Sequence, residues 1–234
     1  MGAGDQIESA ITAAFTQTDQ ALYDEICEMY RVTPLERPLG AIGTTVAGIL
    51  VHNRLAYLVN LGDSTAAILE KKRGILMQTA MHKPDLFAEH QRIALAGGWV
   101  SQATVVHVGP KVARQPARLN GVLAVSRSFG DWMFEQVFSG VDLPYPITDH
   151  DQAVVSKIPT IQSLPLSSIH GSGFLALLAT DGLTDVQSLD QVYRFLTWHG
   201  ETPDWRFEAL GGFLKHVEKP DNTTVLIVVF EKEK

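Results

Sequence analysis

Cysteine is almost absent from this chain, since Cys27 is the single one among 234 residues. One thiol forms neither an internal disulfide nor a zinc site built from several cysteines. We interpret Cys27 as a small apolar residue on a helix. Long apolar runs are missing too, because no stretch approaches the roughly 18 consecutive apolar residues of a membrane span. No basic segment followed by an apolar one marks a secretory signal, so we expect an intracellular, cytoplasmic protein.

An excess of positive charge is also missing. The sequence has 19 Lys and Arg against 26 Asp and Glu, which gives a formal net charge of −7. Proteins that bind nucleic acid through their general electrostatic field need a basic surface, so the composition argues against a nucleic-acid partner. The hydrophobic fraction of 45% and the charged fraction of 19% are those of an ordinary globular protein. At this length we expect a single domain over residues 1–234.

Apolar residues at helical spacing predict helices over residues 4–30, 84–96, 189–199 and 203–217. Short apolar and β-branched runs predict strands at 44–51, 55–61, 65–70, 121–126, 173–180 and 223–231. Residues 101–119 are expected to be irregular, as an excursion from the core. Turn-like breaks between the early strands indicate an antiparallel meander, and the helices stand in separate blocks. This pattern favours an α+β fold in which two antiparallel β-sheets pack as a sandwich flanked by helices.

Two aspartates stand at the ends of strongly apolar runs. Asp181 directly follows residues 173–180, and Asp221 shortly precedes residues 223–231. Carboxylates at the ends of buried strands can meet in space and present hard oxygen ligands to Mg²⁺ or Mn²⁺. Two such ions would align a water molecule for attack on phosphorus. Asp-Gly and Asp-Asn are also common turn pairs, so a purely structural role stays open for both residues.

Four other polar residues have more than one interpretation. Asp63 lies in a Gly-Asp-Ser break between two apolar runs, which by itself indicates only a tight turn. Arg127 fits phosphate binding or a salt bridge, and the salt bridge is the commoner use. Asp131 fits a helix cap, a salt bridge or a site residue. His82 precedes Lys-Pro at a helix entry and fits hydrogen bonding or capping better than metal coordination.

Five motifs occur in a fixed order between about residue 7 and residue 230. They are GTTVAGILV with LAYLVNLGDSTAAIL, HKPDLFAEHQRIALAGGWV, RLNGVLAVSRSFGD, LLATDGLTDV and DNTTVLIVVF. Together they resemble the metal-dependent, PPM-type protein phosphatase family, which is also called protein phosphatase 2C-like. The resemblance implies a sandwich of two antiparallel sheets flanked by helices. It also implies a two-metal Mg²⁺ or Mn²⁺ centre that hydrolyses phosphoserine and phosphothreonine through metal-bound water.

The motif match carries individual roles onto this sequence. The resemblance implies that Asp181 and Asp221 are metal ligands, and that Asp63 lines a weaker third-metal position. It places residues 99–119 in a flap beside the active site. The family pattern further has an early acidic strand, a phosphate-binding arginine and an Asp-Gly-His-Gly motif ahead of the first long helix. This chain has no counterpart of these three features, and no catalytic residue is therefore assigned.

We accordingly expect an N-terminally truncated form of the fold, with Mg²⁺ or Mn²⁺ bound weakly or not at all if the site is incomplete. A vacated sheet edge would need a protein partner to cover it. Two hypotheses follow. The first is a serine/threonine protein phosphatase that acts on phosphoprotein substrates with impaired turnover. The second is an inactive pseudophosphatase that serves as a binding or structural module in a larger complex.

Overall fold

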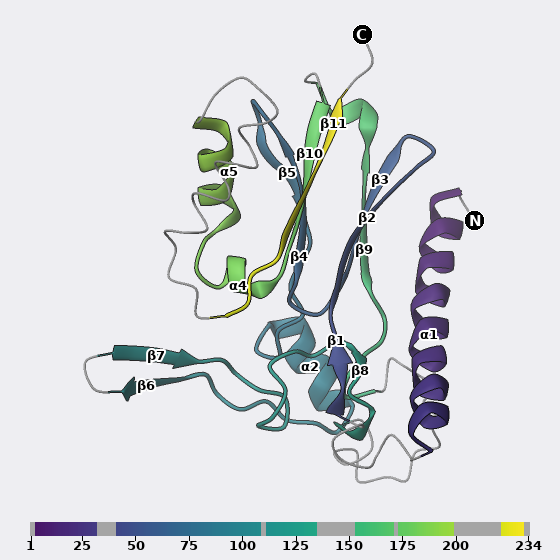
Figure 1. The fold of residues 1–234 in the computed structure, drawn as a ribbon, viewed down its shortest axis with the longest axis vertical. Helices are drawn as coiled ribbons and strands as arrows, with labels where there is room; N and C mark the ends of the chain where they lie inside the picture. Colours follow the sequence, from purple (N-terminus) through teal and green to yellow (C-terminus); the bar gives the residue numbers. More distant parts are fainter. Residues whose placement is uncertain are drawn as a thin grey trace. The chain divides into compact units, whose positions relative to one another are not determined.

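The computed structural model describes residues 3–31, 41–108, 111–134, 153–170, 173–198 and 221–231. The chain divides into two compact units, and each unit is described by itself (Figure 1). Unit 1 comprises residues 1–46, 61–63 and 81–159, and unit 2 comprises residues 47–60, 64–80 and 160–234. In the described part of the chain, no helix has the length and apolar character needed to cross a membrane.

Unit 2 contains nearly all of two antiparallel sheets. One sheet has the order β11-β10-β4-β5, and the other has the order β2-β3-β9 (Figure 1). The strands are β2 (Val46–His52), β3 (Leu55–Leu61), β4 (Thr65–Glu70), β5 (Gly74–Gln78), β9 (Thr160–Pro165), β10 (Gly173–Ala179) and β11 (Val225–Glu231). The predicted α+β sandwich is thereby confirmed. Strands β5 and β9 were not predicted.

The alternation of side chains along β4 explains how the two faces of its sheet are filled. Every residue of β4 is buried, since the strand lies between β10 and β5. Ala66 and Ile68 belong to the core between the two sheets, where they join residues of β3 such as Leu58. Ala67 and Leu69 point to the opposite face. A strand buried on both faces is apolar at successive positions, which is why its sequence run is continuous.

Helices cover the outer face of the four-stranded sheet. The helix α4 (Asp181–Thr184) follows β10 directly, and α5 (Leu189–Trp198) lies beside β5 (Figure 1). Their fully or almost fully buried residues Leu183, Val192 and Leu196 pack with Leu177 of β10. The Tyr193 hydroxyl of α5 also donates to the carbonyl oxygen of Lys71 at 2.9 Å. This layer places the amino terminus of α4 at the end of β10.

The described residues of unit 1 include helices, a small sheet and a hairpin. Among the helices are α1 (Ala3–Tyr30) and α2 (Phe87–Leu95). The strands β1 (Gly43–Thr44) and β8 (Phe129–Gly130) pair with each other, and β6 (Thr104–Val108) and β7 (Lys111–Gln115) form an antiparallel hairpin. Its core contains residues from α2 and from the segments 119–134 and 153–155. These residues are Ile93, Leu119, Met133, Phe134, Val154 and Val155.

A buried carboxylate attaches α1 to the small sheet. Asp19, which is 3% exposed, accepts a hydrogen bond from the Gly130 backbone N–H at 2.7 Å and another from the Trp132 indole N–H at 3.0 Å. Ring contacts flank this acid on the same helix. Phe15 packs on Phe129 at 5.1 Å, and Tyr23 meets Trp132 edge-on at 5.5 Å. The helix is therefore held by polar and aromatic contacts together.

Several sequence predictions of single elements need correction. Residues 121–126 form turns and bridges rather than a strand. Residues 101–119, which were expected to be irregular, contain the hairpin β6–β7. The helix predicted at 84–96 begins at Phe87, because Leu86 has an extended backbone with ψ 135°. The helix predicted at 203–217 lies outside the described residues. The single domain over residues 1–234 and the flap role of 99–119 stay predictions.

Candidate metal centre

The end of β10 and the start of β11 place Asp181 and Asp221 at the same end of the four-stranded sheet. The two strands are antiparallel neighbours, and Ala179 stands opposite Val225 at the end of the ladder. Beyond the ladder the pairing continues through Thr180, whose N–H donates to the carbonyl oxygen of Thr224 at 3.1 Å and whose hydroxyl oxygen accepts the Thr224 N–H at 3.0 Å. Asp181 directly follows Thr180, and Asp221 lies three residues before Thr224, so both aspartates lie close to this pair of hydrogen bonds in the sequence.

Gly182 allows the two segments to approach each other closely. A Cβ atom at this position would lie only 2.8 Å from the Thr223 hydroxyl oxygen and would overlap the Asn222 carbonyl oxygen. No side chain fits in that space. The Asp-Gly pair at 181 and 182 is therefore explained by the contact between the start of α4 and the segment that leads into β11.

The environments of the two carboxylates differ. Asp181 is partly buried in the first turn of α4, whereas Asp221 is exposed. The Asp221 Oδ1 atom accepts the N–H of the next residue, Asn222, at 2.6 Å. This local hydrogen bond involves one of the two carboxylate oxygens of Asp221.

The donor atoms at this edge fit Mg²⁺ or Mn²⁺ in chemistry, because both ions prefer carboxylate oxygens. They fit only part of a coordination shell. Among the described residues, no group of three or more His, Cys, Asp and Glu side chains gathers where it could hold a metal ion. The structure therefore brings Asp181 and Asp221 to one edge without completing a cluster around them.

Asp63 lies in unit 1, in the turn between β3 and β4, and is 7% exposed. The preceding Gly62 has a φ of 105°, a conformation that strongly favours glycine. Two hydrogen bonds join His82 to this glycine. The His82 backbone N–H donates to the Gly62 carbonyl oxygen at 2.9 Å, and the imidazole Nδ1 atom of His82 accepts the Gly62 backbone N–H at 3.0 Å. The predicted hydrogen-bonding role of His82 is confirmed.

A buried ion-pair network surrounds His82. Glu89 of α2, which is 4% exposed, accepts hydrogen bonds from Arg127, from Arg92 at 3.1 Å and from the Ser126 hydroxyl at 2.7 Å. Burial acts to raise the pKa of Glu89, but the hydrogen bonds and charges of these partners outweigh it and lower the pKa to about 2. The salt-bridge interpretation of Arg127 is confirmed by its ion pair with Glu89, and the guanidinium also donates to the Ile158 carbonyl oxygen at 2.9 Å.

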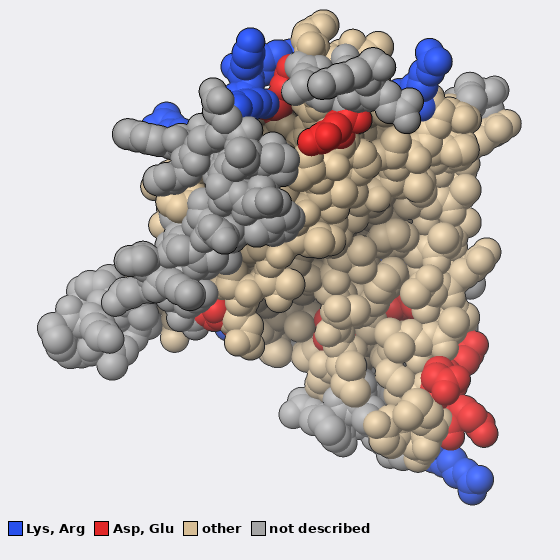
Figure 2. All heavy atoms as spheres, turned by 45° about the horizontal axis from the view of Figure 1, so that its top comes forward, with Lys and Arg blue, Asp and Glu red and all other residues tan. Residues whose placement is uncertain are grey.

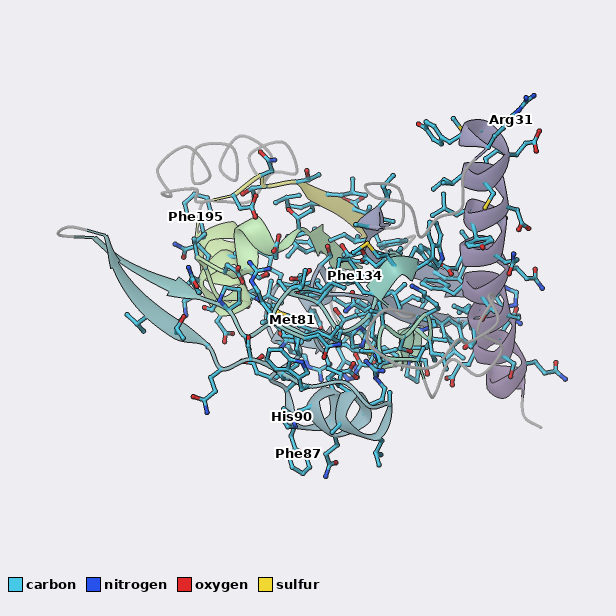
Figure 3. All side chains as sticks on the ribbon, turned by 90° about the horizontal axis from the view of Figure 1, so that it is seen from below. Arg31, Met81, Phe87, His90, Phe134 and Phe195 are labelled. Atoms are coloured by element: carbon cyan, nitrogen blue, oxygen red, sulfur yellow. The ribbon has the colours of Figure 1, made fainter. Side chains whose placement is uncertain are left out.

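The same surroundings keep His82 neutral. Burial is the largest cause that lowers its pKa, and the positive charge of Arg127 lowers it further, to about 4. Glu89 acts in the opposite direction and Arg92 in the same direction as Arg127, with smaller effects. An imidazole that accepts a hydrogen bond at Nδ1 carries its proton on Nε2. His90 on α2 is different, because its side chain is exposed and points away from the unit beside Phe87 (Figure 3).

Asp131 lies in a hydrogen-bonded turn rather than in a set of candidate ligands. It is 5% exposed, has a φ of 55°, and accepts the Ser128 hydroxyl at 2.6 Å. Burial raises the pKa of Asp131, while the Ser128 hydrogen bond and the Lys157 charge lower it in part. Lys157 is fully buried and donates to the Gly130 carbonyl oxygen. The contact with the Ser128 hydroxyl is none of the three interpretations of Asp131, and the helix cap, the salt bridge and the site residue stay predictions.

The network around Glu89 was missed by the sequence analysis. A usable signal exists, because Glu89 and the fully buried Ile93 are four residues apart and share the inward face of α2. Arg92, three residues after Glu89, then completes an ion pair on the same helix. On the face drawn in Figure 2, Lys and Arg side chains lie only at the margins of the described surface, and uncharged residues fill its centre.

Comparison with known proteins gives a consistent result. The family model described as protein phosphatase 2C matches residues 2–202. The "Probable protein phosphatase 2C 13" of Arabidopsis thaliana is 28% identical over 231 residues, which cover 97% of this chain and 50% of that protein. The "Probable protein phosphatase 2C 69" of the same plant is 31% identical over 227 residues, which cover 97% of this chain and 52% of that protein.

A solved structure shares the fold. The crystal structure of a serine-threonine phosphatase 2C from Toxoplasma gondii aligns with a TM-score of 0.61 at 22% sequence identity, over 97% of this chain and 67% of that chain. The chain spans about half the length of the curated relatives that it matches.

Proposed function

Because the chain belongs to the protein phosphatase 2C family, we propose that it acts in the hydrolysis of phosphoserine and phosphothreonine in protein substrates. When bound, Mg²⁺ or Mn²⁺ would supply an activated water and would neutralise charge on the phosphoryl group. The observation that carries the proposal is the placement of Asp181, just after β10, and of Asp221, shortly before β11, at one end of the sheet in which these strands pair. Two carboxylates at such an edge are suitable ligands for a hard cation.

The chain's own residues have separable roles in this proposal. Asp181 would hold the cation from the first turn of α4, and Gly182 permits the close approach of the segment that carries Asp221. Asp63, in its buried turn, would serve a weaker cation position.

We propose in addition that this chain by itself has low phosphatase activity. Mg²⁺ is usually bound through one or two carboxylates, with waters completing about six oxygen ligands, so the two carboxylates at this end of the sheet are few for a centre of two ions. The described residues contain no group of three possible ligands, which supports weak binding. The same observation favours the second candidate, an inactive family member that binds a protein partner. In the described part of the chain, β11 pairs on one side only, with β10, so its other edge is a candidate surface for such a partner.

Hydrolysis of a small aryl phosphate and of a phosphothreonine peptide, with and without Mn²⁺, tests the proposal. The variant Asp181→Asn, Asp221→Asn removes both charges and should abolish any Mn²⁺-dependent turnover. The matched control is Asp190→Asn, because Asp190 is an exposed acid of α5 in the same unit. Turnover that the double variant retains would contradict the assigned ligands. A folded wild-type chain with no Mn²⁺-dependent turnover would overturn the phosphatase proposal and favour the binding module.

A further inference from the structure

One histidine, His82, forms two hydrogen bonds with the turn that contains Asp63. His82 donates its N–H to the Gly62 carbonyl oxygen at 2.9 Å and accepts the Gly62 N–H on Nδ1 at 3.0 Å. Both hydrogen bonds join residues of unit 1, and His82 is only 3% exposed. A backbone–side chain pair of this kind satisfies both polar groups of Gly62, which would otherwise be buried without water.

The turn has little freedom on its other sides. A Cβ atom at Gly62 would lie 2.6 Å from the Cβ of Thr45 and 3.3 Å from the Arg127 carbonyl oxygen. The positive φ of Gly62 further restricts the backbone. The direction of the chain as it enters Asp63 is therefore set by packing on two sides and by the His82 hydrogen bonds on a third.

His82 is itself fixed by the ion-pair network. Its carbonyl oxygen accepts the Ser126 backbone N–H at 2.9 Å and also lies 2.9 Å from the Ser126 hydroxyl oxygen. Ser126 is fully buried, and its hydroxyl also contacts Glu89 at 2.7 Å. Arg92 donates to the Ser126 carbonyl oxygen at 2.9 Å. A continuous chain of hydrogen bonds thus leads from the charged residues of α2 to the backbone beside Asp63.

We infer that His82 is a positioning residue, whose Nδ1 atom fixes the Gly62–Asp63 turn so that the Asp63 carboxylate is held in place before a cation binds. The functional part of this inference rests on the proposed role of Asp63 as a cation ligand. A ligand whose backbone is already ordered loses less conformational entropy on binding, so its affinity for the cation is higher. Removing the acceptor should loosen the turn and weaken the contribution of Asp63.

Two substitutions separate this role from general packing. In His82→Asn, the amide oxygen takes nearly the place of Nδ1 and can accept the Gly62 N–H. In His82→Leu, a side chain of comparable size offers no acceptor. The matched control is His90→Leu, because His90 is an exposed histidine of the same unit.

The first readout is native-state amide hydrogen exchange at Gly62 and Asp63, measured without metal. We expect His82→Leu to lower protection at Gly62 by roughly tenfold, the loss that corresponds to one net hydrogen bond. His82→Asn should retain protection close to that of the wild type, and His90→Leu should change nothing. Unchanged protection in His82→Leu would overturn the inference. If His82→Leu does not fold, His82→Gln replaces it, because its longer side chain displaces the acceptor; equal protection in the Asn and Gln variants would then overturn it.

The second readout is Mn²⁺ affinity in a double-mutant cycle with Asp63→Asn. We expect His82→Leu to weaken Mn²⁺ binding several-fold in the wild-type background and to have no effect once Asp63 is neutralised. Equal losses in both backgrounds would overturn the link to Asp63. The two readouts fail separately from the proposed function: a chain that neither binds Mn²⁺ nor turns over substrate contradicts the phosphatase proposal, whereas the exchange measurement still decides whether His82 holds the turn.

Discussion

Single buried residues in unit 1 combine charge with complete hydrogen bonding. Glu89 is nearly inaccessible to water, yet it stays ionised because Arg127, Ser126 and Arg92 surround it. His82, beside the same residues, stays neutral because burial and the Arg127 charge oppose its protonation. The pKa of the acid and the pKa of the base are both lower in the fold than their ordinary values. The folded state is therefore favoured at a pH well above these folded-state pKa values.

Stability should therefore fall as the pH is lowered. The ordinary pKa of 6.5 for His82 drops to about 4 in the fold, so between these values the unfolded chain binds a proton that the folded chain excludes. The stabilisation is complete above pH 6.5 and is lost toward pH 4, by up to about 1.4 kcal/mol per pH unit. The low pKa of Glu89, about 2, extends the loss to lower pH. Urea unfolding across this range measures the slope.

The variant His82→Asn carries no titrating group at this position and is the control. Its free energy of unfolding should depend less steeply on pH between 6.5 and 4 than that of the wild type. His90→Asn is the control for the exchange of a histidine for asparagine, because His90 is exposed in the same unit. An equal slope in the wild type and in His82→Asn would show that another group, and not His82, takes up the proton.

At the scale of elements, the candidate metal edge depends on the contact between the start of α4 and the segment before β11. Gly182→Ala should destabilise unit 2 by about 1–3 kcal/mol, because the new Cβ would lie 2.8 Å from the Thr223 hydroxyl oxygen and overlap Asn222. It should also weaken Mn²⁺ binding, since the segments that carry Asp181 and Asp221 must separate. Chemical denaturation and a Mn²⁺ titration measure the two effects.

Gly48→Ala is the matched control for this prediction. Gly48 lies on β2 in the same unit, and a Cβ atom there would meet nothing within 4 Å. The control should leave both stability and Mn²⁺ affinity nearly unchanged. A Gly182→Ala variant that matched it would mean that the two segments can rearrange at little cost, and the close approach would then have no bearing on the aspartates.

An apolar run in the sequence predicts a strand correctly only where the buried chain is also a regular strand. The run at β4 predicted a strand correctly, because both faces of that strand are buried in regular sheet. Residues 121–126 are equally apolar, yet the chain turns there: Asn120 and Gly121 have φ values of 46° and 74°, and Leu119 bridges Leu123. Apolarity reports that a residue is buried, and several backbone conformations can bury it.

One part of the candidate site, the placement of two aspartates beside neighbouring strands, was predictable for the same reason. Asp181 and Asp221 border strongly apolar strands that proved to be neighbours, so their common edge followed once those strands paired. The hydrogen bond from the Gly62 N–H to the Nδ1 atom of His82 joins residues that are 20 positions apart in the sequence. No periodic pattern encodes such a bond, because it depends on the tertiary placement of two irregular segments.

At the scale of the whole molecule, the order of segments along the chain bears on cooperativity. Residues 1–46, 61–63 and 81–159 belong to unit 1 and the intervening segments to unit 2, so the chain passes from one unit to the other five times. Separate domains are commonly joined by few connections that lie in linkers. One crossing lies within β3, before Leu61, and the next lies between Asp63 and the start of β4. The single domain over residues 1–234 stays a prediction, which the unfolding of the two units tests.

We therefore expect both units to unfold in one transition. Ile93→Ala in the core of unit 1 and Leu177→Ala in the core of unit 2 each remove a fully buried side chain and should each cost about 2–5 kcal/mol. In urea, hydrogen exchange of peptides from α2 and from β10 should shift together in both variants. Leu95→Ala and Leu226→Ala are the surface controls, since these side chains are 90% and 56% exposed. If each core variant shifted only the peptides of its own unit, the units would be independent folding domains.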